Sequence, residues 1–373
     1  MRRCISLLIS SIISFALLYQ FIFVVYEKSE PGFTDKNLKH VKEVMTMRTN
    51  KKILIAVVLC LASFLATAGT VRGFEGPLNI RNSFPLFLAI GNPSIISAKG
   101  ENSIDLNFMY SSTYLVNTSE EWSFNLDLEA AIMDIQIRKL FFGDSVELSL
   151  DLPVISFNSG FLDGFLESYH SAFGFPDYGR SNRPPNDFLF KVSHNGRTVV
   201  TGRSGEIALG DIKVGIKKAL YVKDPYISIY GSVEFPTGDP KGGYGNGTLD
   251  TSIALLVNKG IGDRVMTYLN TGAVFTDGFR AEETIDLEDY LYGAAGVEWL
   301  YSNTLSLNTQ FFIQGSPFKN TGIRAIDEVA TILSFGGRYR INQEKSLEFS
   351  FSEDTNTAGA PDFMAGFGYR YKF

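Results

Sequence analysis

Apolar and polar residues alternate with a period of two through most of the chain after Gly76. In one stretch, Ile104 and Leu106 alternate with Asp105 and Asn107. The same pattern recurs around residues 146–152, 212–217, 305–313 and 363–373. Such alternation predicts β-strands with one apolar and one polar face. A soluble β-sandwich would show it too, so alternation alone does not select a membrane protein.

The connections between strands are more selective. The pattern divides into about twelve candidate strands, at 103–114, 122–140, 145–157, 206–219, 225–236, 248–260, 264–276, 288–301, 304–316, 327–341, 345–354 and 363–373. Tight connections, such as 143–144 and 302–303, alternate with longer ones at 115–121, 158–205, 237–247, 277–287, 317–326 and 355–362. Short turns at one end and long loops at the other are typical of outer-membrane barrels. We therefore predict an all-β fold, a transmembrane antiparallel up-and-down β-barrel of about twelve strands with both termini on the periplasmic side.

The strand at 122–140 has an irregular pattern. Its apolar residues occupy even positions from Trp122 to Ala130, then odd positions at Ile135 and Ile137. A β-bulge near Met133 would explain the change of parity. Two separate strands are the alternative.

If the apolar parity faces lipid, the polar parity lines the lumen. The predicted lumen residues are Asp105, Asp127, Glu129, Glu147, Asp151, Lys213, Lys217, Arg338, Arg340, Arg370 and Lys372. The acidic ones fall on the first three strands, and the basic ones fall on the strands expected to flank them. Their pairing could fill the interior, or leave a narrow water-filled passage between an acidic and a basic side. A barrel of this size lies between filled eight-stranded barrels and open sixteen-stranded porins, and we favour the narrow passage.

Two apolar stretches precede the barrel. The second, 53–65, follows Arg48 and Lys51 and ends in Ala66-Thr67-Ala68, which predicts a signal peptide over 47–68. Residues 1–46 then form an apolar and linker segment from an over-extended gene start, although a membrane helix at 5–26 is the alternative. Residues 69–102 are expected to be an N-terminal periplasmic or lumenal segment, and 103–373 the barrel.

Composition and the C-terminus narrow the partners. The net charge is -6, which gives no support to nucleic-acid binding. The chain has two cysteines, Cys4 and Cys60, both in the apolar leader, so a processed chain would have no disulfide or thiolate site. The final strand of alternating aromatics ends at Phe373, which resembles the signal that the barrel-assembly machinery recognises. The expected partners are that machinery, outer-membrane lipids and an unidentified small solute, with location in a Gram-negative outer membrane as a multi-pass barrel.

The connection 158–205 is the longest. Apolar residues from Phe161 to Phe173 recur at helical spacing, which predicts a short helix over 159–175 in an extracellular loop. A structured loop of this length is usually functional. Its candidate gate residues are Asp163, Glu167, His170, Arg180 and Arg183. The alternative is that the helix rests its apolar side on the barrel rim or the lipid surface.

An enzyme is not predicted. Outside the leader the histidines are His170 and His194, both in this loop, and no serine stands at an evident spacing from them. The spacing of Asp163, Glu167 and His170 is insufficient for a metal site. We predict no catalytic residue, no metal and no cofactor.

Three stretches of the chain resemble a family of predicted outer-membrane proteins called domain of unknown function 3187. They are Gly76-Pro77-Leu78-Asn79 with Arg81-Asn82 and Pro85-Leu86; Gly160-Phe161-Leu162-Asp163 with His170, Phe173-Gly174, Arg183 and Pro185; and Gly210-Asp211-Ile212 with Phe235-Pro236-Thr237-Gly238. The resemblance spans residues 75–373 and implies a barrel in the outer membrane, without an activity. Pro-Thr-Gly at a strand end also occurs in barrels related to phenol-degradation operons and is less specific.

The polar lumen and the long loop together predict a narrow channel or transporter for small solutes, gated or plugged by loop 158–205. The alternative is a structural or ligand-binding barrel with a filled lumen, and an outer-membrane hydrolase is the third reading.

Overall fold

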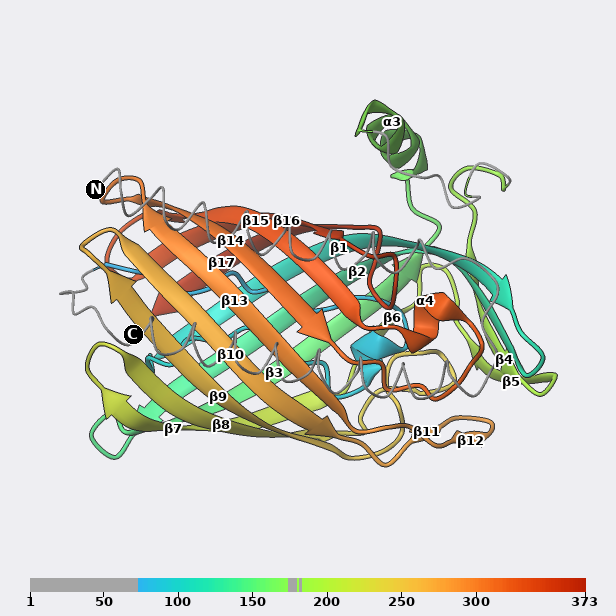
Figure 1. Ribbon diagram of the computed structural model, residues 1–373, viewed down its shortest axis with the longest axis horizontal. Helices are drawn as coiled ribbons and strands as arrows, with labels where there is room; N and C mark the ends of the chain where they lie inside the picture. Colours follow the sequence, from blue (N-terminus) through green and yellow to red (C-terminus); the bar gives the residue numbers. More distant parts are fainter. Residues whose placement is uncertain (1–72, 174–179, 181–182) are drawn as a thin grey trace, which may run out of the picture. The chain divides into compact units, whose positions relative to one another are not determined.

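The computed structural model describes residues 73–173, 180 and 183–373, without the side chains of 169–173. The predicted leader and the start of the chain lie outside these residues. Within them, twelve antiparallel strands form one closed wall (Figure 1). They are β1 (Ser103–Thr118), β2 (Trp122–Phe141), β3 (Val146–Asn158), β7 (Ile212–Val222), β8 (Tyr226–Phe235), β9 (Asp250–Ile261), β10 (Val265–Phe275), β13 (Tyr290–Leu300), β14 (Leu305–Gln314), β15 (Ala330–Arg340), β16 (Lys345–Asp354) and β17 (Phe363–Lys372).

The wall closes through its first and last strands. Asp105 on β1 pairs with Gln136 on β2 and with Arg370 on β17. β2 also pairs with β3, and β3 pairs with β7, which completes the ring without an edge. The prediction of an all-β barrel with about twelve strands is confirmed, and each predicted strand corresponds to an observed one.

Short elements extend the wall at the end that carries the long connections. Strand β6 (Ile207–Leu209) continues β7 along β3, and the hairpin β4 (Leu189–His194) and β5 (Arg197–Thr201) pairs with β2. The pair β11 (Phe279–Arg280) and β12 (Thr284–Ile285) and the helices α3 (Asp163–Phe173) and α4 (Arg324–Asp327) also lie at this end (Figure 1). Short turns occupy the opposite end, which is the periplasmic end of such barrels.

Two predicted strand boundaries differ from the structure by more than three residues. The β1–β2 connection is only residues 119–121, because both strands continue beyond the barrel body and pair as far as Thr118 and Ser123. The strand predicted at 206–219 is divided into β6 and β7 at Gly210 and Asp211.

The bulge predicted near Met133 is wrong. β2 is one strand, and its pairing with β1 is regular from Ser123 to Arg138. Its inward face is apolar from Trp122 to Ile132 and polar from Asp134 onward. The inward face of β2 thus changes from apolar to polar along the barrel axis. In the sequence, this moves the apolar residues from even to odd positions, as a bulge would.

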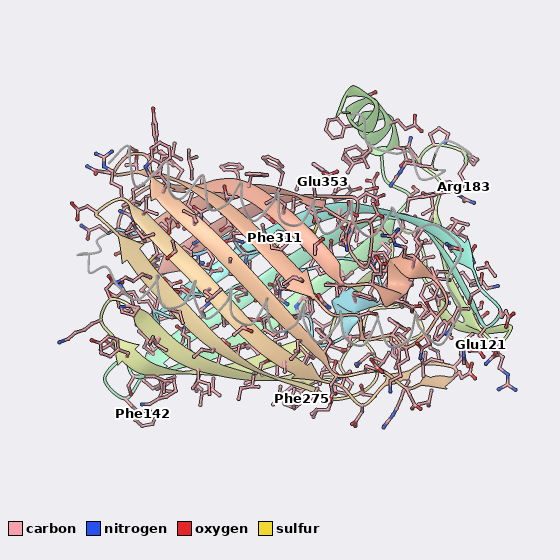
Figure 2. All side chains as sticks on the ribbon, in the orientation of Figure 1. Glu121, Phe142, Arg183, Phe275, Phe311 and Glu353 are labelled. Atoms are coloured by element: carbon pink, nitrogen blue, oxygen red, sulfur yellow. The ribbon has the colours of Figure 1, made fainter. Side chains whose placement is uncertain are left out.

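The outer wall is apolar. Large side chains exposed on it include Phe108, Ile216, Ile253, Phe275, Phe335, Phe351 and Phe367. Figure 2 shows the side chains that project from the wall and labels Phe275 among them. In 73–173 and 183–373, no helix is long and apolar enough to cross a membrane.

Candidate functional site

The lumen is occupied by the chain's own residues 73–102, which we call the plug. Backbone amides of Glu75 and Gly76 donate to the carboxylate of Glu298 on β13, at 3.0 and 3.1 Å. Farther along, the hydroxyl of Ser228 on β8 donates to the carbonyl of Ala98 at 2.6 Å. Side chains on the inward faces of strands across the wall thus hold the plug along its length.

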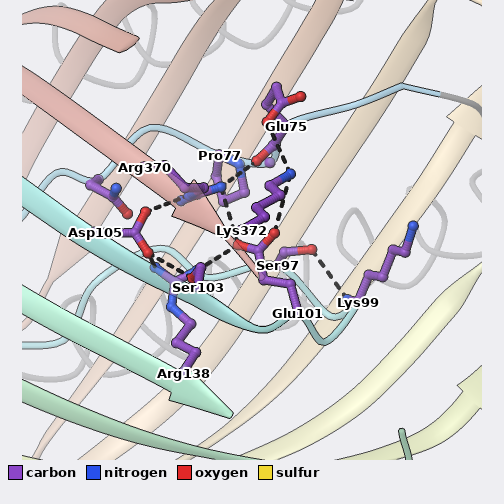
Figure 3. Close-up of polar contacts among 12 residues, drawn as sticks. Glu75, Pro77, Ser97, Lys99, Glu101, Ser103, Asp105, Arg138, Arg370 and Lys372 are labelled. Atoms are coloured by element: carbon purple, nitrogen blue, oxygen red, sulfur yellow. Dashed lines mark hydrogen bonds and ion pairs between the residues drawn. The ribbon is translucent and has the colours of Figure 1, made fainter. Parts of the chain in front are cut away.

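Charged pairs fill the periplasmic half of the lumen (Figure 3). Plug residue Glu101 lies 2.9 Å from Arg138, 3.1 Å from Arg370 and 3.3 Å from Lys372. Arg370 also binds Asp105, the acidic residue opposite it on β1. Because buried charges are costly without partners, these mutual contacts make a closed, charged half-lumen stable.

Two further cations join the plug to the wall. Arg81 of the plug lies 2.7 Å from Asp134 on β2 and 2.8 Å from Asp151 on β3. From the wall, Lys213 donates to the carbonyl of Asn92 at 2.5 Å and pairs with Glu234 at 3.1 Å. The five charged side chains in these contacts are all buried, so plug and wall share one electrostatic network.

The extracellular half of the lumen is apolar. The plug forms a 3₁₀ turn, η1 (Phe87–Ala89), whose Phe87 stacks on Phe318 at 5.8 Å between ring centroids. Phe318 in turn meets the edges of Trp122 and Phe124, the inward residues of β2. One hydrophobic cluster therefore contains both the plug and the upper wall.

The turn at η1 contains unfavourable backbone. Leu86 is buried at φ 74° and ψ -48°, a conformation that L-residues with large side chains rarely adopt. Gly91 follows at φ 58°, and a Cβ there would lie 2.3 Å from Cγ1 of Val274 on β10. The residues on either side of η1 thus pack closely against the wall although their backbone is in an unfavourable conformation.

The plug is not part of the β-sheet. Among the described residues, its one β-bridge is internal, between Arg81 and Ser94. Its backbone bonds to the wall through side chains, apart from a contact of Phe373 with Asn102 at the point where β1 begins. A small cavity of about 10 Å³ lies near Asn79, Asp105 and Arg338. The plug thus occupies the lumen, but the wall does not need the plug in order to close.

The predicted lumen residues divide into two groups. Asp105, Glu147, Asp151, Lys213, Lys217, Arg338 and Arg370 are buried on inward faces, and Arg340 and Lys372 are partly exposed at the periplasmic mouth, where both bind Glu75. Glu147 pairs with Lys217 across β3 and β7 at 2.8 Å. Acidic and basic side chains of neighbouring strands therefore pair. The plug occupies the space in which a water-filled passage was expected.

Asp127 and Glu129 were predicted to face the lumen, and the structure places them on the outer face of β2. Their neighbours Leu126 and Leu128 face inward, and Glu129 pairs in register with Ser112, an outward residue of β1. Both acids are nevertheless buried, because loop 158–205 covers them. Asp127 binds Arg183 at 2.6 Å, and Glu129 accepts the backbone amides of Phe161 and Leu162. The polar residues Asp127 and Glu129 of β2 therefore bind the loop on the outer face and do not line the lumen.

The candidate gate residues lie outside the barrel. Asp163 at the start of α3 pairs with Arg180 at 2.5 Å, and Arg180 also binds Asp362 and the hydroxyl of Ser112. Glu167 is exposed, and the side chain of His170 lies outside the described residues. Figure 1 shows α3 beside the extracellular end of the wall, so the helix does not enter the lumen. In 73–168, 180 and 183–373, no three His, Cys, Asp or Glu side chains are arranged to hold a metal ion.

The sequence reasoning missed the plug's own charged residues and their partners, among them Glu75, Arg81, Glu101, Arg138, Glu234, Glu298 and Glu348. A signal was available in Arg81, a cation inside an apolar stretch that has no alternation of its own. Lumen-facing acids on strands without a facing cation, such as Glu298, were a second signal.

The third resembling stretch forms a loop anchor. Asp211, between β6 and β7, accepts the backbone amides of Gly238 at 2.8 Å and Asn246 at 3.1 Å. The hydroxyl of Thr237 donates to the carbonyl of Gly210 at 2.8 Å. Burial, with Glu234 nearby, raises the pKa of Asp211 to about 7. The connection between β8 and β9 is thereby fastened to the top of β7.

The family described as "Protein of unknown function (DUF3187)" matches residues 52–373. The chain belongs to this family. The resemblance noted in the three stretches is thus confirmed, and the closed barrel with an apolar outer wall is that of a multi-pass outer-membrane protein.

Several solved structures share the barrel architecture at low identity. The COG4313 outer membrane channel from Pseudomonas putida F1 is 13% identical, with 74% of this chain and 96% of that chain covered and a TM-score of 0.49. The NanC porin is 8% identical, with 72% and 100% covered and a TM-score of 0.44. A deletion mutant of the TodX monoaromatic hydrocarbon channel is 11% identical, with 79% and 100% covered and a TM-score of 0.41. No curated protein matches the sequence.

Proposed function

We propose that this protein is an outer-membrane channel for small amphipathic solutes, closed at rest by residues 73–102. The plug takes the role that the sequence suggested for loop 158–205. One observation carries the proposal: the plug binds the wall through side chains, whereas the twelve strands close by pairing among themselves. Displacing the plug therefore breaks no strand pairing.

The solute class follows from the two halves of the lumen. With the plug displaced, the extracellular half would present Phe124, Phe318 and Tyr290 to a solute. The periplasmic half would present Asp105, Arg138 and Arg370. An amphipathic molecule can be solvated in both halves, whereas a purely polar one would cross the apolar half without hydrogen-bond partners.

Conductance through planar bilayers tests the proposal. In a background with Cys4 and Cys60 replaced by Ala, Ser97→Cys and Asn258→Cys place thiols where plug and β9 now share a hydrogen bond of 2.7 Å. Bridging them with a short, reducible bifunctional thiol reagent should abolish openings, and reduction should restore them. The matched control, Thr118→Cys with Ser123→Cys, bridges β1 to β2 and should leave openings unchanged.

A second variant lacks residues 73–95 and should conduct continuously. A heat-modifiable deletion variant without conductance would overturn the proposal and favour a structural or binding barrel with a filled lumen. The observation that favours this second candidate is the set of buried ion pairs between plug and wall, such as those of Arg81 with Asp134 and Asp151.

A further inference from the structure

A largely buried polar cluster lies on the outer wall of the barrel, where neighbouring residues face lipid. It consists of Asp127, Glu129 and Ser112 on β2 and β1, the loop residues Asp163, Arg180 and Arg183, and Asp362 before β17. On the same outer face of β1, Ile104, Leu106 and Phe108 are apolar and exposed.

The height of this cluster can be compared with the membrane. An apolar belt of about 25 Å, crossed by strands tilted by about 40° with a rise of about 3.4 Å per residue, takes about ten residues of each strand. Counted from Ile104, the belt reaches about Tyr114. Ser112 and its β2 partner Glu129 therefore fall within the height of the outer leaflet.

Exposed carboxylates at that height would be costly in hydrocarbon. Here contacts with the loop lower the cost. Arg183 neutralises Asp127, and the amides of Phe161 and Leu162 satisfy Glu129 Oε1 at 2.9 and 2.6 Å. The segment that begins α3 is consequently fastened to the wall at membrane depth, beside the barrel.

The outer side of this segment continues the lipid-facing surface. Phe108 stacks near Tyr110 at 6.4 Å between centroids, and Tyr110 stacks on Phe161 at 5.4 Å. Phe165 meets Phe363 of β17 at 5.9 Å. Phe161 is 70% exposed and Phe165 is 52% exposed, so aromatic surface runs without interruption from the wall onto α3.

We propose that the start of α3 is a membrane-embedded flap that inserts Phe161 and Phe165 among the acyl chains of the outer leaflet. The lipid surface is the partner of this face. The ionic cluster fastens it to the wall, and the exposed Glu167 lies about 200° around the helix from Phe165, on the opposite side. This role is independent of whether the lumen conducts.

Spin labels test the flap in the full chain reconstituted in bilayers. Single cysteines replace Phe161, Phe165 or Glu167 in the Cys4→Ala, Cys60→Ala background, with Phe108→Cys as the lipid-facing reference and Asn195→Cys, at the tip of the β4–β5 hairpin, as the aqueous one. Accessibility to dissolved oxygen and to a water-soluble nickel complex is measured at each site. The oxygen-to-nickel ratio should be several-fold higher at 161 and 165 than at 167, and should approach that at 108.

Equal ratios at 161, 165 and 167 would overturn the proposal. Strong spin–spin broadening at 161 would also overturn it, because a second copy of the chain would then cover the face. Since a label could disturb the flap, a second measurement uses Phe161→Trp and quenching by brominated acyl chains. Quenching no greater than in an Asn195→Trp control would contradict insertion, provided that both variants remain heat-modifiable.

Discussion

Nη2 of Arg81 lies 2.8 Å from Oδ2 of Asp151, and this contact ties the plug to the inner face of β3. The same nitrogen lies 2.7 Å from Asp134 on β2, so one guanidinium pairs with two buried carboxylates. Two neighbouring acids in a closed lumen would repel each other without it. Arg81 therefore holds the plug to two neighbouring strands of the wall at once.

Replacing Arg81 with Gln should release the plug. Removing one partner of a buried ion pair typically costs about 3–5 kcal/mol, which corresponds to at least about a hundredfold shift in the seating equilibrium. We expect frequent channel openings in planar bilayers where the parent chain is mostly closed. Arg81→Lys should lie between the two, because it keeps the charge.

Arg324→Gln is the control for this substitution. Arg324 pairs with Glu328 at the surface, where such pairs are worth about 0–1 kcal/mol, and its loss should leave the openings unchanged. An Arg81→Gln protein as closed as the parent would show that the ion pairs do not seat the plug.

Gly91→Ala should unseat the plug by a different route. The new Cβ would lie 2.3 Å from Cγ1 of Val274, and the backbone at φ 58° is also unfavourable for Ala. Openings should increase. Adding Val274→Ala removes the clash and should restore part of the closure, although Val274→Ala alone leaves a cavity. Non-additive effects of the two substitutions on open probability would show direct contact, whereas additive effects would refute it.

The strands of this barrel were predictable because one face of each meets lipid over most of its length. That constraint produces a period of two in the sequence. The predicted bounds of β9, β14 and β17 agree with the observed bounds to within a few residues. The plug has no such constraint. Its contacts are made by side chains to strands distant in sequence, for example Gly76 with Glu298, and no local pattern encodes them.

The outer-face acids were misplaced for a related reason. Alternation shows that a strand has two different faces but does not show which face is inside. The polar face was assigned to the lumen by the general rule that the outer face meets lipid. On β2 the rule is inverted near Asp127, because the plug makes the inner face apolar and the loop makes the outer face polar. Each of the three resembling stretches contains a charged residue that ties its segment to the rest of the protein: Arg81 in the plug, Asp163 and Arg183 in loop 158–205, and Asp211 in the loop anchor.

The pH dependence of the loop anchor follows from Asp211. Its pKa is raised from an ordinary value near 3.8 to about 7, so the folded protein binds a proton more tightly than the unfolded chain. This contribution to stability is therefore present at low pH and is lost as the pH rises from about 4 to above 7, by at most about 1.4 kcal/mol per pH unit.

Asp211→Asn should flatten this slope between pH 5 and pH 8, because the amide resembles the protonated acid. The measurement is the temperature of heat modification at constant ionic strength. Asp263→Asn, in an exposed periplasmic turn, should keep the parent slope. An unchanged slope in Asp211→Asn would assign the pH dependence to other groups.

Glu129→Ala should detach the flap while leaving the barrel intact. The substitution removes the acceptor of the Phe161 and Leu162 amides, and an unsatisfied buried amide costs about 1–3 kcal/mol. Protease added to intact cells should then cut within 158–205 faster than in the parent, with heat modification of the barrel unchanged. Glu129→Gln keeps an acceptor oxygen and should resist cleavage nearly as well as the parent, and Glu167→Ala should be silent because that side chain is exposed. Equal cleavage of Glu129→Ala and Glu129→Gln would show that this carboxylate does not hold the loop against the wall.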